Sequence, residues 1–195
     1  MTAILKSSEL IPVEEYLEGE LLSSVRHEFV SGYVYAMAGA SDEHNRIAGN
    51  IFAFLHAALR GKRCEAFTND MKVKLSPQIG DVYYYPDVLV ACDPTDKSRY
   101  FRERPTVIIE VISPETERID RREKAQAYRT IPTVQACVLV EQDRMRFTVL
   151  RPVGNQDWQT ETVEGRDAVL RLPEIGVEIP CERIYERTAL MDRPE

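Results

Sequence analysis

The stretch that decides the fold runs from residue 106 to residue 140 and reads TVIIEVISPETERIDRREKAQAYRTIPTVQACVLV. Its first part, residues 106–112, is rich in β-branched side chains, which is typical of a buried strand. Residues 120–128 are predicted to form a helix that ends before the Ile131–Pro132 step, because a residue that precedes proline avoids the helical region. Residues 135–140 form a second apolar strand. We therefore predict a strand–helix–strand unit with two parallel strands.

Further elements are predicted on both sides of this unit. Ser41 has the residue type of a helix N-cap, and apolar residues follow it at helical spacing as far as Gly61, a plausible stop. The other expected elements are a short helix after Pro12, a hairpin at residues 25–37, extended stretches at 65–75 and 82–91, short strands after Met145 and a helical turn at 180–185. Hairpins combined with one crossover predict an α/β (α+β) fold, a mixed sheet flanked by helices.

Length and composition favour one domain. The 195 residues, 22.4 kDa in mass, contain 44% hydrophobic and 29% charged side chains, which is ordinary for a globular protein. We expect a single domain over residues 1–195 with its core at about 12–185. No apolar run approaches the ~20 residues of a membrane span, and the N-terminus lacks the apolar segment of a signal peptide, so we expect a cytoplasmic protein.

Charge and cysteine usage restrict the function further. The formal net charge is −7, so any contact with nucleic acid must be local. Basic residues gather in two segments, at 97–104 and 118–124, which are also consistent with a solvated loop and a solvated helix face. The four cysteines are far apart in sequence and are predicted to be buried or free thiols in a reducing compartment: Cys64, Cys92, Cys137 and Cys181. The three histidines form no zinc-binding pattern.

A carboxylate, Glu110, interrupts the first apolar strand. Strand alternation places Glu110 on the same face as Ile108 and Ile112. A charge at such a position is costly to bury unless it has a partner. The crossover helix is expected to bring Lys124 near Glu110, and Tyr128 lies one turn further along the same helix face.

A second carboxylate is expected nearby. Asp87 follows Pro86 at the head of an apolar run, and proline is tolerated at the first position of a strand, so Asp87 should lie at a strand edge. Asp87 and Glu110 beside Lys124 form the donor set of a hard-cation site, since magnesium takes one or two carboxylates together with waters and phosphate oxygens. This set favours phosphodiester hydrolysis. The alternatives are that Asp87 caps a turn and that Glu110 forms a buried ion pair without metal.

The ordered acids and lysine are similar to the PD-(D/E)XK nuclease superfamily, and the chain resembles more closely its Uma-two (Uma2) family of small restriction-endonuclease-like proteins. The resemblance runs from residue 12 to about 185. Its carrying segments are RHEFVSG at 26–32, YPDV at 85–88, IEVISP at 109–114 and DRREKAQAY at 120–128. One departure from the superfamily pattern is Ile112, which stands where a lysine is expected, and Lys124 on the following helix fits that role.

The resemblance implies a restriction-endonuclease-like fold with its site at one end of the sheet. It implies that Asp87 and Glu110 bind Mg²⁺, with Mn²⁺ as a substitute, that Lys124 is the catalytic lysine and that Glu28 is an additional acidic residue. Residues that are expected to contact the substrate are His44, Arg121 and Tyr128. For His44 we also keep open a contact with Glu28 and a purely structural role at the start of its helix.

These expectations lead to one principal function and two alternatives. The principal one is a magnesium-dependent endonuclease that cleaves DNA as a homodimer, with one site for each strand. The first alternative is a catalytically silent module on the same fold that binds nucleic acid or protein. The second is a metal-dependent hydrolase of small molecules that uses the same acids.

Overall fold

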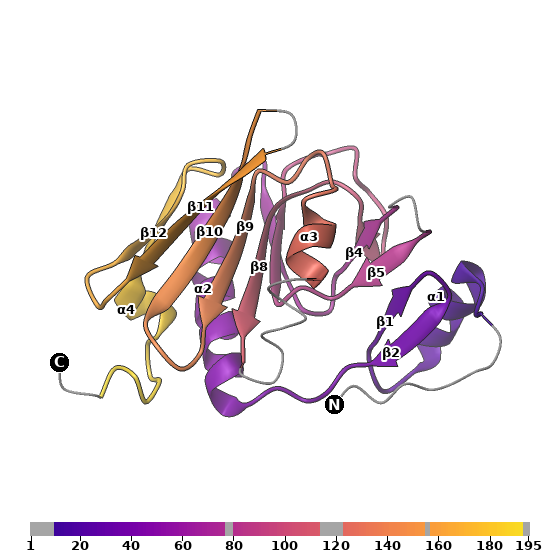
Figure 1. Ribbon diagram of the computed structural model, residues 1–195, viewed down its shortest axis with the longest axis horizontal. Coiled ribbons are helices and arrows are strands. Elements are labelled where there is room, and N and C mark those ends of the chain that lie inside the picture. The colour runs from indigo at the N-terminus through magenta and orange to yellow at the C-terminus, as the bar shows by residue number, and fades with distance from the viewer. Residues whose placement is uncertain (1–9, 77–79, 114–122, 155–156, 193–195) are drawn as a thin grey trace.

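The computed structural model describes residues 10–76, 80–113, 123–154 and 157–192, and Figure 1 shows how their elements are arranged. The larger of two main sheets has the strand order β11-β10-β9-β8-β6-β3. Its strands are β3 (Glu65–Thr68), β6 (Val88–Ala91), β8 (Pro105–Ile112), β9 (Ala136–Glu141), β10 (Arg146–Val153) and β11 (Asp157–Glu164). Only the β8–β9 pair in this sheet is parallel, so the sheet is mixed.

The predicted strand–helix–strand unit is confirmed in β8 and β9. The two strands pair in parallel, with Glu110 opposite Leu139, and every residue of both strands is buried. Between them the structure describes α3 (Ala125–Tyr128), while residues 120–122 of the predicted helix lie outside the described residues. The alternation of β8 is also as predicted, because Ile109 faces one hydrophobic cluster and Ile108 faces the other, which contains Tyr128.

The smaller main sheet has the order β2-β1-β5-β4-β7. Its strands are β1 (His27–Val30), β2 (Tyr33–Ala36), β4 (Lys72–Leu75), β5 (Val82–Tyr84) and β7 (Phe101–Arg102). The hairpin predicted at residues 25–37 is confirmed as β1 and β2, and its turn residues Ser31 and Gly32 both have positive φ angles, of 50° and 94°.

Two predicted extended stretches are each divided between the main sheets. The stretch at 65–75 forms β3 in the larger sheet and β4 in the smaller one, and the stretch at 82–91 forms β5 and β6 in the same way. The crossing from β5 to β6 is made by Tyr85, Pro86 and Asp87, where proline, which has no N–H to donate, breaks the ladder. This crossing sets Asp87 at the head of β6.

Helices pack against both main sheets. Helix α2 (Asp42–Leu59) begins as predicted, because the Oγ atom of Ser41 accepts a hydrogen bond from the backbone N–H of His44. Its buried residues pack against the larger sheet, and Figure 1 shows α2 along one face of that sheet and α3 on the side of β4 and β5. Helix α1 (Val13–Leu22) follows Pro12 and stacks Tyr16 on Phe29 of β1.

The C-terminal part adds a small hairpin and a helical turn. It consists of β12 (Val169–Leu172), β13 (Val177–Pro180) and α4 (Cys181–Ile184), which pack into the same cluster as α2. The predicted helical turn is confirmed in α4. The strands after Met145 are longer than predicted, because β10 and β11 are eight residues each and pair along their whole length. Among the described residues, no helix combines the length and apolar character needed to cross a membrane.

The prediction that all four cysteines are thiols is wrong for two of them. Cys64 and Cys92 form a disulfide with a Cα–Cα distance of 4.0 Å. The physical reason is the antiparallel register of β3 and β6, which pairs Glu65 with Ala91. This register brings the residue before β3, Cys64, next to the residue after β6, Cys92. Cys137 and Cys181 are buried free thiols, as predicted, and burial raises the pKa of Cys181 to about 11.

Candidate functional site

Polar side chains from several elements meet at the end of the larger sheet where β6 begins and β8 finishes. Because β6 and β8 are antiparallel, with Val88 opposite Ile109, Asp87 lies beside Glu110. The backbone N–H of Asp87 lies 3.4 Å from the Oε2 atom of Glu110, measured from the nitrogen. The two carboxylates that the sequence singles out are therefore adjacent, at the sheet end that also receives the N-terminus of α2.

Both oxygens of Asp87 have partners. Its Oδ1 atom lies 2.8 Å from Nε2 of His44, which stands in the first turn of α2. Its Oδ2 atom accepts a hydrogen bond of 2.7 Å from the backbone N–H of Val111. The side chains of Asp87 and His44 are 14% and 15% exposed, so solvent reaches both members of this pair.

Glu110 is the buried carboxylate of the site, with 3% of the residue exposed. The hydroxyl of Tyr128 donates a 2.6 Å hydrogen bond to Oε1 of Glu110, and the Nζ atom of Lys124 lies 3.8 Å from the same oxygen. These partners compensate for removing the charge from water. Burial, followed by the nearby charge of Glu110, raises the pKa of Tyr128 well above its ordinary value, so the phenol stays a proton donor.

Lys124 has a closer partner in Glu28. Its Nζ atom lies 2.7 Å from Oε1 of Glu28, and the backbone N–H of Tyr85 donates to the same oxygen at 3.3 Å. The ammonium group also lies 5.5 Å from the centre of the Tyr84 ring. Burial, with a smaller contribution from Glu28, raises the pKa of Tyr84 to about 12, while Lys124 acts in the opposite direction.

Most of the predicted site residues are brought together. The connected side chains are Glu28, His44, Asp87, Glu110, Lys124 and Tyr128. Arg121 lies outside the described residues. His44 contacts Asp87, a partner that was not expected from the sequence, and Tyr128 is fully buried against Glu110.

Sequence reasoning missed two contributors to the site. One is the backbone of Val111 and Tyr85, whose N–H groups hold Asp87 and Glu28, and no residue type signals such a contact. The other is the ring of Tyr84 beside Lys124. The side-by-side tyrosines at 83–85 were the available signal for that aromatic lining.

The carboxylates are suited to a hard divalent cation. Within the part of the chain that the structure describes, no three His, Cys, Asp or Glu side chains are grouped so as to hold a metal ion by themselves. Magnesium does not need such a group, since it binds through one or two carboxylates and completes its shell with waters and phosphate oxygens. A carboxylate offers about four lone-pair positions, so Asp87 and Glu110 retain acceptor capacity beyond the hydrogen bonds described above.

Comparison with known proteins identifies the family. The model of the Uma2 family, described as "Putative restriction endonuclease", matches residues 13–182. The chain belongs to the Uma2 family. Two relatives from Synechocystis are similar to this Uma2 chain over most of its length. The uncharacterized protein sll1609 is 30% identical over 168 residues, covering 85% of this chain and 94% of the relative. The uncharacterized protein slr1290 is 33% identical over 177 residues, covering 90% and 92%.

A solved structure shares the fold of this Uma2 protein. It is a crystal structure titled as a "putative nuclease belonging to DUF820" from Anabaena variabilis, with a TM-score of 0.70 and 17% sequence identity. The match covers 90% of this chain and 97% of the other. The predicted fold class, a restriction-endonuclease-like arrangement of mixed sheets flanked by helices, is thereby confirmed.

Proposed function

We propose that this Uma2 protein is a magnesium-dependent endonuclease that hydrolyses phosphodiester bonds of DNA. The observation that carries the proposal is the adjacency of Asp87 and Glu110 with the Nζ atom of Lys124, 3.8 Å from Glu110, at one end of the sheet. The descriptions of the family, "Putative restriction endonuclease", and of the structural neighbour, "putative nuclease", support the same reaction class.

Each side chain has a definite part in this proposal. Asp87 and Glu110 hold the divalent cation, with Mn²⁺ as a substitute for Mg²⁺. When bound, the metal makes a water nucleophilic and stabilises charge on the phosphoryl oxygens. Lys124 orients the attacking water, or stabilises the negative charge that develops on phosphorus-bound oxygen. Tyr128 fixes the carboxylate of Glu110 through its 2.6 Å hydrogen bond.

The remaining residues hold these groups in place. Glu28 contacts Lys124 at 2.7 Å and so sets where its ammonium group lies. His44 lies 2.8 Å from Asp87 and restrains that carboxylate, and its side chain, 15% exposed, is proposed to contact a phosphate group of the substrate. Because a duplex has two strands, we further propose that the protein acts as a homodimer with one site for each strand. Light scattering coupled to gel filtration measures that state directly.

One observation favours the catalytically silent alternative. The ammonium of Lys124 is nearer to Glu28, at 2.7 Å, than to Glu110, at 3.8 Å, and Asp87 has protein partners on both oxygens. A binding module that does not use its acids for catalysis would also retain such a network, in which the charged groups are paired with one another. The two functions differ in whether a divalent cation converts a bound nucleic acid into products.

A cleavage assay tests the proposal. Purified protein is incubated with supercoiled plasmid, linear duplex, single-stranded DNA and RNA in Mg²⁺, Mn²⁺ or EDTA, with Asp87→Ala purified in parallel to expose contaminating nucleases. Cleavage of DNA by wild type in Mg²⁺ or Mn²⁺, and by neither protein in EDTA, is the expected result. Binding without cleavage under every condition favours the silent module. Equal cleavage by a folded Asp87→Ala variant overturns the proposed site.

A further inference from the structure

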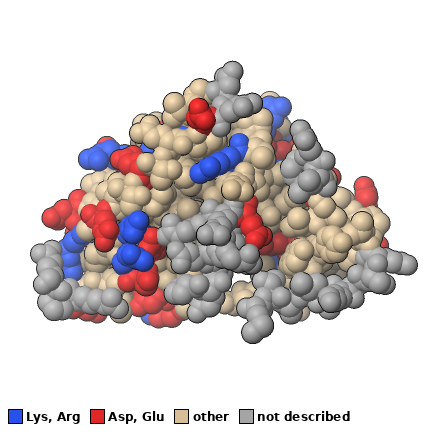
Figure 2. Space-filling view, in the orientation of Figure 1, with Lys and Arg blue, Asp and Glu red and all other residues tan. Residues whose placement is uncertain are grey.

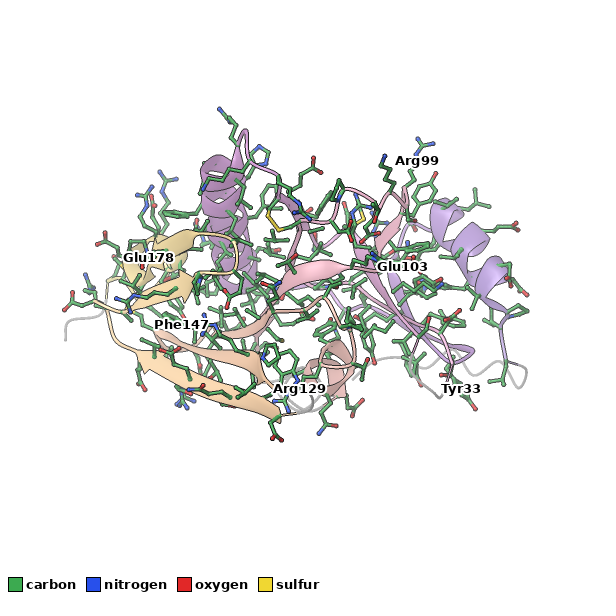
Figure 3. All side chains as sticks on the ribbon, turned by 90° about the horizontal axis from the view of Figure 1, so that it is seen from above. Tyr33, Arg99, Glu103, Arg129, Phe147 and Glu178 are labelled. Carbon is green, nitrogen blue, oxygen red and sulfur yellow. A yellow bond between two sulfur atoms is a disulfide. The ribbon has the colours of Figure 1, made fainter. Side chains whose placement is uncertain are left out.

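Exposed basic side chains gather at the end of the larger sheet opposite the Asp87–Glu110 pair. This end is formed by the chain that follows α2 and by the connection from β6 to β8. We name the group the distal basic surface, and its exposed members are Arg60, Lys62, Arg63, Lys97, Arg99 and Arg104. Figure 3 looks onto this end of the molecule, with Arg99 and Glu103 labelled. Over the face drawn in Figure 2, by contrast, acidic and basic side chains are interspersed.

Three acidic residues of this region are engaged within the protein, whereas Glu65, at the start of β3, is exposed. Asp93 accepts hydrogen bonds from Thr95 and lies 3.0 Å from a guanidinium nitrogen of Arg104. Asp96 accepts from the backbone N–H groups of residues 103 and 104, at 3.0 and 2.8 Å. Glu103 lies 3.3 Å from Nζ of Lys74, on β4. These carboxylates therefore stabilise the loop.

Four basic side chains of the distal basic surface differ from Arg104, which is paired with Asp93. Within the described parts of the chain, no ion pair involves Arg60, Lys62, Lys97 or Arg99. Arg99 instead lies over the ring of Tyr100, at 5.5 Å, and Tyr100 is itself 42% exposed. The region thus presents a positive field on a chain whose formal net charge is −7.

The two segments that carry these charges are joined. The Cys64–Cys92 disulfide connects the residue after Arg63 to the residue before Asp93. The Nε atom of Arg63 also donates a 2.5 Å hydrogen bond to the carbonyl oxygen of Cys92. The relative placement of the two basic segments is therefore fixed before any ligand binds, which lowers the entropic cost of binding.

We propose that the distal basic surface binds the phosphodiester backbone of nucleic acid, separately from the Asp87–Glu110 site. Lysine and arginine at exposed positions provide sequence-independent phosphate contacts, and local charge of this kind is what an acidic protein requires for such binding. Arg60 follows His44 by sixteen positions, so the two ends of α2 lie about 24 Å apart at 1.5 Å per residue. The surface and the site are at opposite ends of the larger sheet, and neither needs the other to contact a ligand.

The proposal is tested by binding in EDTA, so its failure is distinguishable from a failure of the nuclease proposal. Fluorescence anisotropy with a labelled 30-base-pair duplex, and with a matched single strand and RNA, gives the dissociation constant between about 50 and 200 mM salt. The variant Lys62→Gln/Arg99→Gln removes one charge from each segment. Its control, Arg171→Gln/Arg183→Gln, removes two exposed charges elsewhere and gives the same net charge.

If both side chains contact phosphates, the slope of log affinity against log salt falls by about 1.8 for the duplex, and affinity near 0.1 M salt weakens about tenfold or more. The control Arg171→Gln/Arg183→Gln should bind as wild type does. Equal binding by Lys62→Gln/Arg99→Gln and the control overturns the proposal. So does binding to anionic lipid vesicles with no measurable binding to any nucleic acid.

Discussion

The ammonium group of Lys124 lies 2.7 Å from a carboxylate oxygen of Glu28, whereas 3.8 Å separates it from Glu110. The lysine precedes α3 directly, and Glu28 comes from β1 in the other main sheet. One ion pair therefore joins the crossover between β8 and β9 to the smaller sheet, and it decides where the ammonium group lies relative to the buried Glu110. The position of Lys124 depends on Glu28 as well as on its own backbone.

Replacing Glu28 tests this dependence. Glu28→Gln leaves the Lys124 ammonium, 9% exposed, without its nearest countercharge, so we expect the free energy of unfolding to fall by about 3 kcal/mol. Urea denaturation measures the change. Glu161→Gln, at an exposed glutamate of β11, is the control and should change stability by less than about 1 kcal/mol. An unchanged midpoint for Glu28→Gln would show that the pair does not stabilise the fold.

Tyr128 is expected to stabilise the charge on Glu110. In Tyr128→Phe the ring still packs, but a buried carboxylate loses its 2.6 Å hydrogen bond, and we expect a loss of about 1–3 kcal/mol in unfolding free energy. Thermal or urea denaturation checks this, with Tyr100→Phe at an exposed position as the matched control. A similar loss in both variants would contradict a specific role for the Tyr128 hydroxyl.

The buried tyrosines predict the response of the protein to alkali. Tyr84 has a pKa raised by burial to about 12, against about 10 in an unfolded chain. The folded state therefore keeps this proton longer, and the stability that Tyr84 contributes is complete below pH 10 and is lost as pH rises to about 12. Raised pKa values are shared by Tyr16, Tyr83, Tyr84, Tyr85, Tyr128 and Tyr185.

Tyrosinate absorbance near 295 nm measures the ionisation of these tyrosines as pH rises. Of the nine tyrosines, the six with raised pKa values should ionise late, at the pH at which the protein unfolds. Circular dichroism follows the unfolding in parallel. In concentrated guanidinium chloride, all nine should ionise near pH 10. A single native transition near pH 10 without loss of structure would contradict the burial of these rings.

The Cys64–Cys92 disulfide gives a chemical prediction. Alkylation of the denatured, unreduced protein should label two of the four cysteines, and prior reduction should expose all four. The bond closes a loop across 28 positions, so Cys64→Ser/Cys92→Ser should lose about 3–4 kcal/mol of unfolding free energy in the chain-entropy description. Mass spectrometry and urea denaturation provide the readouts. Four labelled cysteines before reduction, in protein purified without reductant, would show that the bond is absent.

Local patterns predicted much of the fold and most of the candidate site. The buried pair β8 and β9 could be predicted because β-branched runs and a crossover of suitable length are local features. The position of Lys124 near Glu110 followed from the same unit. The fold class drew equally on the family resemblance, and the role of Glu28 rested on that resemblance alone.

Features that depend on pairing between distant segments could not be predicted. Nothing in residues 65–75 indicates that this stretch leaves one sheet for another, and the disulfide depends on the register of β3 against β6. The contact of His44 with Asp87 likewise requires the start of α2 to lie beside the start of β6, 43 positions further along the chain. Such contacts are set by tertiary packing, and their partners carry no local signal.

The most direct test of the central proposal is the initial rate of supercoiled plasmid cleavage in Mg²⁺ by wild type and Glu110→Gln. The control is Glu178→Gln, which makes the same chemical change at an exposed position, 66% accessible, on β13. If Glu110 holds the metal, cleavage by Glu110→Gln falls at least about a hundredfold, a barrier increase of about 2.7 kcal/mol, while Glu178→Gln cleaves as wild type does. Undiminished, metal-dependent cleavage by a folded Glu110→Gln protein would contradict the account.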